Sequence, residues 1–523
     1  MFWQTFILNS VVALSYEYHL ESGEKMADRS IIIIGAGLAG LATGCYGQMN
    51  AYKTKIFEMQ AKPGGVCVSW KRKGYTFDYA IHNLFGITPD VEDNRLWREL
   101  GALHGLKTLS FKEFVQVEDT EGRVLTVYTN LDELEKHMAT LAPNDSEKIS
   151  EFVKACRRFS GYDLFAAASG GFGTKIKMLP LLGLLTKYSK MTLEEYAQGF
   201  SDSFLRKAFA TIQYDIPNVP VVIPLIFLST MSKGEGGWPV GGSFALSKNV
   251  ERRYLELGGQ IAYGSKVAKI LIEKDRAIGV QLDDGSKHFA DIVVSAADGY
   301  STIFNMLDGK YASDSIRDYY SSYPKTIPFG FEVWYGVNRD FSGEPHALVL
   351  FQDEPLSFEG REYNRLDVEI FNFDPSLAPS GKTVVKVVLD SDYDYWRRLS
   401  ENAKEYDEEK RRIADVIAGR LQKRFPSFKA QIEVFDVVTP ISVEHWTSAY
   451  RGSCVPYPAP KHIAKEVAKN GVSKKLPGLQ GFYMVGQWAG AVYSTNQVSS
   501  MGRDLVRQLC KRDSKEFVST TAG

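Results

Sequence analysis

Residues 30–40 read Ser-Ile-Ile-Ile-Ile-Gly-Ala-Gly-Leu-Ala-Gly, a β-branched run that leads directly into a glycine-rich turn. Such a continuous apolar run predicts a strand that is buried on both faces of a parallel sheet. The apolar segment that follows, to about Met49, predicts a helix, and Thr54 to Glu58 predicts a second strand. The order of strand, glycine turn, helix and strand predicts a parallel βαβ unit.

The spacing of the three glycines meets the physical requirements of a dinucleotide-binding turn. Gly35 permits the tight turn, Gly37 lets the backbone approach a pyrophosphate, and Gly40 lets helix and strand pack closely. The N-terminus of the helix then faces the phosphates. A carboxylate at Glu58, 18 residues after Gly40, can accept both hydroxyls of an adenosine ribose. The alternative is a βαβ unit that binds nothing, and the fingerprint alone leaves NAD and FAD open.

The composition excludes several classes of protein. The chain has 523 residues, of which 44% are hydrophobic, and this length predicts two domains that can be interleaved. Its 62 basic and 63 acidic residues give no reason to expect nucleic acid as a partner. The five cysteines are scattered without CxxC spacing, so we predict no disulfide framework, no metal site, and a reducing, cytoplasmic location. The 27 tyrosines and 30 phenylalanines are consistent with a sizeable apolar pocket.

The rest of the chain predicts an α/β protein. Residues 145–203 are mostly helical in pattern, and short strands follow between residues 261 and 294. One long charged helix is expected from Tyr393 to Phe425, between strands at Lys382–Leu389 and Gln431–Val438. The last unit is a strand at Gly481–Val485, a glycine turn, and a helix from about Gln497 to Lys511.

Three further stretches resemble a known family. They are Gly64-Gly65-Val66-Cys67 with Phe77-Asp78 and Ile81-His82, the block from Pro239 to Asp298, and Gly481 to Trp488. With the glycine turn, they are similar to the phytoene desaturase and retinol saturase group, within the amine-oxidase-like flavoprotein superfamily. The resemblance extends from Ser30 to about Arg512 and is specific for the cofactor FAD, but weak for the substrate.

The resemblance implies a set of site residues. The backbone at Val267 would meet the adenine, and Gly486 and Gln487 would approach the pyrophosphate and ribityl chain of a non-covalently bound FAD. His82 is the histidine that the resemblance places near the flavin, and it is the candidate proton donor; the alternative is a histidine that only hydrogen-bonds backbone. The full set expected to bind the cofactor is Gly35, Gly37, Leu38, Ala39, Gly40, Glu58, Gly64, Gly65, Val267, Gly486 and Gln487.

The sequence departs from the family at two places. The branch often has a proline and a run of glycines after Gly-Gln-Trp, where this chain has Ala489 to Asn496, and side chains there would crowd the edge of the flavin. Val66 stands where many members have arginine, so one phosphate contact is expected to be absent. Cys454 has a spacing that permits a covalent flavin link in some amine oxidases, but an ordinary loop cysteine is the favoured interpretation. Trp446 and Tyr450 are candidates to line the pocket.

The function implied is hydride transfer between flavin N5 and a C–C bond of an apolar substrate that resembles an isoprenoid, carotenoid or retinoid. Two alternatives stay open: an FAD-dependent amine oxidase, and a flavin-dependent isomerase or FAD-binding protein without net redox turnover. Residues 175–190 have an apolar centre flanked by lysines and are a candidate for peripheral membrane contact, although a core helix is the favoured interpretation. The sequence gives no indication of oligomeric state.

The expected architecture is a Rossmann-like FAD-binding domain interleaved with a substrate domain of mixed sheet and helices. The FAD-binding domain is expected to combine residues 29–110, 236–305 and 476–512. The substrate domain is expected to combine residues 111–235 and 306–475. Residues 513–523 are expected to form a C-terminal tail. We interpret residues 1–28 as an N-terminal extension, with Met26 as the expected true start.

Overall fold

The strand that begins at Ser30 lies at the centre of a parallel sheet. A computed structural model describes residues 29–89, 91–162, 178–214, 219–457, 459–460, 462–463, 466–467, 471–490 and 494–522. The expected extension at residues 1–28 lies outside the described residues. Within them, the first sheet has the order β10 (Gln260–Ala262), β2 (Lys53–Phe57), β1 (Ser30–Ile34), β14 (Ile292–Ser295) and β20 (Phe482–Met484). All four strand pairs are parallel.

The β-branched run forms the core of this sheet because both of its faces are covered. Ile31 to Ile34 are at most 4% exposed. The helix α2 (Leu38–Met49) packs against β1 and β2, and α12 (Gly242–Glu256) and α20 (Thr495–Arg512) pack against α2. The sheet therefore draws its strands from three separate stretches of the chain. Residues 30–57, 260–295 and 482–484 contribute them.

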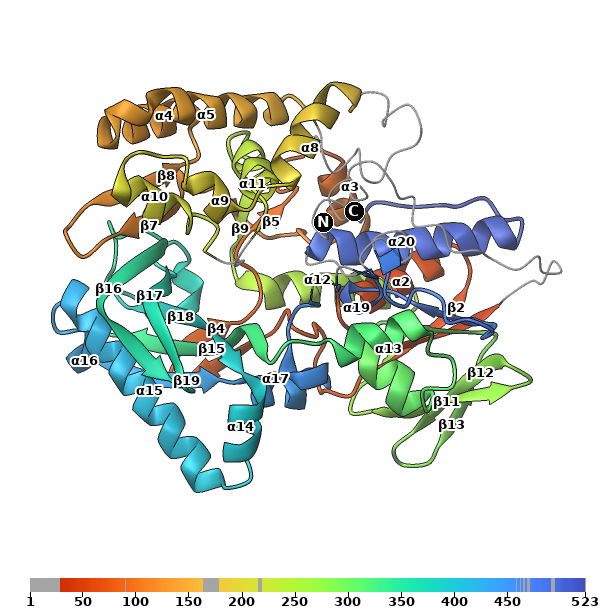
Figure 1. The fold of residues 1–523 in the computed structure, drawn as a ribbon. Helices are drawn as coiled ribbons and strands as arrows, with labels where there is room; N and C mark the ends of the chain where they lie inside the picture. Colours follow the sequence, from red (N-terminus) through yellow and green to blue (C-terminus); the bar gives the residue numbers. More distant parts are fainter. Residues whose placement is uncertain are drawn as a thin grey trace.

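A second, mixed sheet forms the other side of the molecule (Figure 1). Its order is β19 (Ile432–Val438), β15 (Thr326–Val337), β18 (Thr383–Asp392), β17 (Arg361–Ile370), β16 (Ala347–Phe358), β7 (Glu113–Glu118) and β8 (Val124–Tyr128). Its neighbouring strands are antiparallel except for the parallel pair of β16 and β7.

Smaller sheets and the remaining helices complete the described fold. The small sheets are β11 (Val267–Glu273), β12 (Arg276–Leu282) and β13 (Lys287–Phe289); β3 (Ser69–Arg72) and β4 (Tyr75–Asp78); and β5 (Leu84–Phe85), β9 (Gly236–Pro239) and β6 (Thr108–Leu109). The other helices are α3 (Glu92–Glu99), α4 (Leu131–Leu141), α5 (Ser146–Ser160), α8 (Leu182–Ser189), α9 (Leu193–Ala197), α10 (Ser203–Phe209), α11 (Val222–Met231), α13 (Asp314–Ser321), α14 (Tyr393–Leu399), α15 (Ala403–Arg424), α16 (Phe428–Gln431), α17 (Pro440–Thr447) and α19 (Gln487–Gly490). Single turns lie at η1 (Pro143–Asp145), η2 (Leu179–Leu181), η3 (Ser301–Met306), η4 (Pro375–Leu377) and η5 (Tyr450–Gly452). The α/β fold predicted from the sequence is confirmed.

The prediction of one helix from Tyr393 to Phe425 is wrong. The structure has two helices, α14 and α15, with a break at residues 400–402. Asn402 starts the second helix, because its side chain accepts hydrogen bonds from the backbone N–H groups of Lys404 and Glu405. Asparagine is a preferred N-cap residue, since its side-chain oxygen satisfies amides that have no partner inside the helix.

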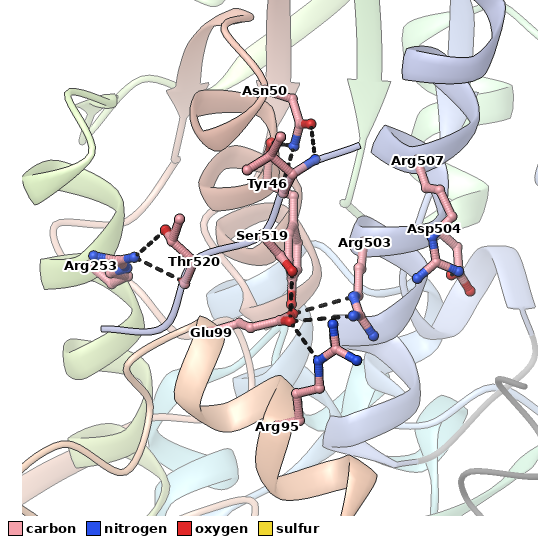
Figure 2. Close-up of polar contacts among 11 residues, drawn as sticks. Tyr46, Asn50, Arg95, Glu99, Arg253, Arg503, Asp504, Arg507, Ser519 and Thr520 are labelled. Carbon is pink, nitrogen blue, oxygen red and sulfur yellow. Dashed lines mark hydrogen bonds and ion pairs between the residues drawn. The ribbon is translucent and has the colours of Figure 1, made fainter. Parts of the chain in front are cut away.

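The tail after α20 docks along the surface formed by α2, α3 and α12 (Figure 2). The backbone of Val518 makes two hydrogen bonds with the side chain of Asn50, at 2.7 and 2.9 Å. Ser519 donates to the buried carboxylate of Glu99, which also accepts from Tyr46 and pairs with Arg503. The tail thus contacts three helices that the chain forms much earlier.

Candidate functional site

A cavity of about 720 Å³ lies at the carboxyl ends of the parallel strands. The residues that follow four of these strands line it. They include Gly35 after β1, Glu58 after β2, Ala296 after β14 and Gly486 after β20. The carboxyl edge of such a sheet is where open α/β folds bind their ligands. The cavity therefore occupies the position that the motif analysis predicts for a cofactor.

Each of the three glycines in the turn is needed for a different physical reason. Gly35 adopts a φ of +97°, which a side chain rarely permits. A Cβ atom on Gly40 would lie 2.0 Å from the carbonyl oxygen of Gly35, so this glycine allows close packing. A Cβ on Gly37 would meet nothing closer than 3.9 Å. Gly37 lines the cavity and caps α2 without a side-chain bond, so the first amides of that helix are available to an anion.

Glu58 stands at the end of β2 with its carboxylate already held by backbone. Its Oε2 accepts from the N–H of Ala36 at 2.7 Å, and its Oε1 accepts from the N–H of Gln60 at 2.8 Å. Burial raises the pKa of Glu58, and these backbone hydrogen bonds oppose that shift. The residue is 6% exposed and lines the cavity, which leaves it in place for the predicted ribose contact.

The other residues predicted to bind the cofactor converge on the same wall. Gln487 donates from Nε2 to the carbonyl oxygen of Cys454 at 2.9 Å. Gly64 donates its N–H to the carbonyl oxygen of Ala36 at 2.9 Å, which joins its loop to the glycine turn. Ten of the eleven predicted residues line the cavity, and Gly40 packs behind it: the ten are Gly35, Gly37, Leu38, Ala39, Glu58, Gly64, Gly65, Val267, Gly486 and Gln487. Their contacts with a cofactor stay a prediction, and the turn at residues 491–493 lies outside the described residues.

One part of the cavity wall is apolar. Ile223, Ile226 and Phe227 from α11 line it together with Phe85 and Phe329. Trp446, one of the two predicted pocket residues, lines the cavity as well. The other, Tyr450, stacks on Tyr300 with ring centroids 4.0 Å apart. The cavity therefore combines a glycine-rich wall with a wall of aliphatic and aromatic side chains.

The histidine of the predicted site has a partner that the sequence did not reveal. His82 lines the cavity, and its Nδ1 is in hydrogen-bonding contact with Oε1 of Glu369 on β17. The other carboxylate oxygen of Glu369 lies 2.5 Å from Nζ of Lys386 on β18. The histidine is thus joined to a buried ion pair.

A second carboxylate faces the cavity near this pair. Glu332 on β15 lines the cavity, is 2% exposed, and accepts a hydrogen bond from the indole of Trp334 at 2.9 Å. Burial raises the pKa of Glu332 to about 7, while Lys386 and His82 lower it. A carboxyl group in this state exchanges a proton near neutral pH.

The sequence patterns did not single out Glu332, Glu369 or Lys386, because each has apolar neighbours in its strand. The signal is a single charge inside a buried strand, as in residues 383–389, Thr-Val-Val-Lys-Val-Val-Leu. Lysine and glutamate are almost never fully buried unless they are paired. A charge at Lys386, Glu332 or Glu369 therefore marks a position with a specific partner.

Asp78 and Cys454 have surroundings that are typical of structural residues. Asp78 accepts a hydrogen bond from the backbone N–H of Phe244 at the start of α12, which is the position of a helix cap. Cys454 lines the cavity, and burial raises the pKa of its thiol to about 12.

Comparisons with known proteins agree over most of the chain. Residues 33–100 match the family model of an NAD(P)-binding Rossmann-like domain. The chloroplastic prolycopene isomerase of Daucus carota is 24% identical over 92% of this chain and 80% of the relative. The lycopene-forming phytoene desaturase of a Paracoccus species is 26% identical over 82% of this chain and 87% of its own. An inactive all-trans-retinol 13,14-reductase of Danio rerio is 21% identical over 82% and 78%.

A solved structure shows the same fold. A putrescine oxidase mutant superposes with a TM-score of 0.60 over 93% of this chain and 99% of its own, at 14% identity. The relatives confirm the resemblance found in the sequence. This protein is therefore an oxidoreductase that resembles the phytoene desaturase and retinol saturase group over most of its length.

Proposed function

We propose that the chain binds FAD and transfers a hydride between flavin N5 and a C–C bond of an apolar substrate of isoprenoid, carotenoid or retinoid type. The observation that carries this proposal is a single cavity with two kinds of wall. One wall has the open amides of α2, and the other has the side chains of Ile223, Ile226 and Phe227. An anionic cofactor suits the first wall, and a hydrocarbon suits the second.

The chain offers specific groups to each part of FAD. The pyrophosphate would lie against Gly37 and the N-terminus of α2, where a Cβ would otherwise occupy the space. Glu58 would accept from the adenosine ribose, and Val267 would meet the adenine. Gly486 and Gln487 would approach the ribityl chain. When bound, the flavin supplies a two-electron hydride donor or acceptor, and the protein supplies orientation and a dry pocket.

We propose that the cofactor is held without a covalent bond. Cys454 is the cysteine in the cavity wall whose place in the sequence suggests a link. Its thiol has a pKa raised to about 12 by burial, so it stays protonated and is a poor nucleophile. Acid precipitation of the holoprotein tests this directly, because non-covalent flavin is released into the supernatant and covalent flavin stays with the pellet.

The absorbance spectrum of the purified protein is the first test of the function. We expect a yellow protein whose extracted cofactor is FAD, and whose flavin is reduced by, or reoxidised by, a polyene or an enone. A protein that is purified colourless and cannot take up FAD refutes the proposal. The chromatographic identity of the released flavin distinguishes FAD from other flavins.

A flavin-dependent isomerase is the second candidate. The likeness to prolycopene isomerase over 92% of the chain favours it. An isomerase would change the geometry of a polyene without a change in mass and would depend on reduced flavin. An amine oxidase, the remaining alternative, would release hydrogen peroxide from a panel of amines. Product mass and peroxide release therefore separate the three activities.

We also propose that the protein is cytoplasmic and contacts membranes through residues 175–190. The favoured interpretation as a core helix applies to the inner side of the described part, because Leu181, Leu185 and Tyr188 are buried. The described part of this segment is η2 and α8, where Leu179 is 58% exposed and Lys187 and Lys190 are also exposed; residues 175–177 lie outside the described residues. No helix among the described residues is both long and apolar enough to cross a bilayer. Flotation with anionic vesicles tests the contact, and Leu179→Ser is expected to weaken it.

A further inference from the structure

Three side chains form a row across neighbouring strands of the mixed sheet. The register pairs Trp334 on β15 with Lys386 on β18, and Lys386 with Glu369 on β17. Side chains that are opposite each other on adjacent strands point to the same face. The row is therefore a consequence of strand register, and it lies on the face that carries Glu332 two residues from Trp334.

The ion pair in this row is buried. Lys386 is 0% exposed, its Nζ is 2.5 Å from Oε2 of Glu369, and it lies 5.1 Å from the ring centroid of Trp334. Burial alone lowers the pKa of a lysine, but Glu369 and Glu332 raise the pKa of Lys386 above its ordinary value. A buried pair contributes little net stability compared with apolar residues of similar volume. Stability thus gives no reason for charges inside a valine-rich strand.

The oxygen of Glu369 that does not contact Lys386 points toward His82 in the cavity wall. Oε1 of Glu369 contacts Nδ1 of His82 and also accepts from the hydroxyl of Tyr214 at 3.3 Å. Burial raises the pKa of a carboxyl group, but the charges of His82 and Lys386 hold the pKa of Glu369 well below its usual range. Because Nδ1 is engaged, Nε2 is the nitrogen left to the cavity that His82 lines.

We infer that Glu369 is a positioning residue that holds His82 with Nε2 toward the substrate, and that Lys386 holds Glu369 in place through its other carboxylate oxygen. This inference rests on the proposed function. In the reduction of a C=C bond, Nε2 of His82 would give its proton to one carbon, while the other carbon would receive the hydride that bound flavin would supply. In desaturation, Nε2 would accept the proton, and the hydride would pass to bound flavin. Glu369 stays a carboxylate throughout, as the partner of a histidine does in other acid–base pairs.

The charged groups around His82 come from three strands. Glu369 lies on β17, Lys386 on β18 and Glu332 on β15, and the hydroxyl of Tyr214 contacts Glu369. To test whether the ion pair affects the pH profile of the reaction, a variant must remove the pair and keep Glu332. The double variant Glu369→Gln/Lys386→Met removes both charges of the pair, but it also raises the pKa of Glu332, which Lys386 lowers in the parent. The single variant Glu369→Gln, which keeps Lys386 beside Glu332, is therefore measured with it.

The matched control is Glu359→Gln. Glu359 is a part-buried carboxylate between β16 and β17 whose Oε1 accepts from the hydroxyl of Ser391 at 2.6 Å, so it tests the same substitution away from His82. We expect both variants to keep the ratio of FAD to protein of the parent. The double variant should lower the rate of flavin reduction or reoxidation by the polyene about 100-fold and change its pH profile. The control should change neither.

A second readout needs no substrate. In protein labelled with isotopic histidine, the ring-nitrogen NMR signal of His82 is identified by its loss in His82→Gln. We expect His82 of the parent to carry a proton on Nδ1, where it is hydrogen-bonded to Glu369. The double variant should show a different tautomer or a mixture. Parent-like tautomer, rate and pH profile in a folded, FAD-loaded double variant would overturn the inference. Failure of the parent itself to bind FAD would instead refute the proposed function.

Discussion

Replacing Gly37 with alanine separates cofactor binding from folding. The backbone at Gly37 has φ −70° and ψ 171°, which alanine adopts without strain. The new Cβ would be 3.9 Å from the carbonyl oxygen of Gly64, an ordinary contact, and it would lie in the wall of the cavity. The methyl group therefore fits the protein but occupies the space proposed for the pyrophosphate.

The size of the effect follows from these contacts. Loss of the cap preference of glycine over alanine is expected to cost the apoprotein at most about 1 kcal/mol. Loss of charge-assisted hydrogen bonds between phosphate and the amides of α2 is expected to cost about 3 kcal/mol of binding. The dissociation constant for FAD should then rise ~100-fold. Titration of apoprotein with FAD, followed by flavin fluorescence, measures this change.

Two other glycines supply the controls. Gly40→Ala places a Cβ 2.0 Å from the carbonyl oxygen of Gly35, so this variant should lose stability even without cofactor. Gly419→Ala lies in α15 with open space around its Cβ and should bind FAD normally. If Gly37→Ala binds FAD within threefold of the parent (roughly 0.7 kcal/mol), or unfolds as Gly40→Ala does, the proposed phosphate site is wrong.

Three further predictions concern the carboxylates and the tail. Burial raises the pKa of Glu332 in the folded protein to about 7, so the parent loses stability as the pH rises from about 4.5, the pKa of this group in the unfolded chain, to 7. In thermal unfolding, Glu332→Gln should be more stable than the parent at pH 8 by up to ~3 kcal/mol and should have no advantage at or below about pH 4.5. Equal stability of the variant and the parent at both pH values would contradict this. Glu58→Gln should weaken FAD binding ~10-fold and lower the stability of the apoprotein by about 1–3 kcal/mol, because its NH2 group would face a backbone N–H that the carboxylate now satisfies; unchanged affinity would exclude the ribose contact. Deletion of residues 516–523 removes the hydrogen bonds to Asn50 and Glu99 and should lower stability by about 3 kcal/mol at unchanged flavin content, and loss of FAD would show that the tail supports the cavity.

The local parts of the fold follow the sequence closely. The first strand, the glycine turn and α2 lie within one or two residues of their predicted positions. The agreement reflects short-range physics, because β-branched residues and glycines at fixed spacing restrict the backbone wherever they occur. The long charged stretch after Tyr393 was wrongly predicted as one helix, because its helical composition hid the cap at Asn402.

The strands of the mixed sheet were harder to predict. β15 is buried at every position from Phe331 to Val337, so it lacks the alternation that identifies a half-exposed strand. Its pairing with β18 and the order of the seven strands depend on contacts between distant segments. Such long-range pairing leaves only a weak trace in a single sequence.

The sequence by itself determined the βαβ unit with its glycine turn, and the resemblance to a known group of enzymes. Each of these depends on residues within about 30 positions of one another, or on motifs with a fixed spacing. Only the tertiary structure decided that the glycine-rich wall and the apolar wall belong to one cavity, and that His82 meets Glu369. Those two residues are 287 positions apart, and their contact depends on strand register and on the docking of two sheets, which no local pattern encodes.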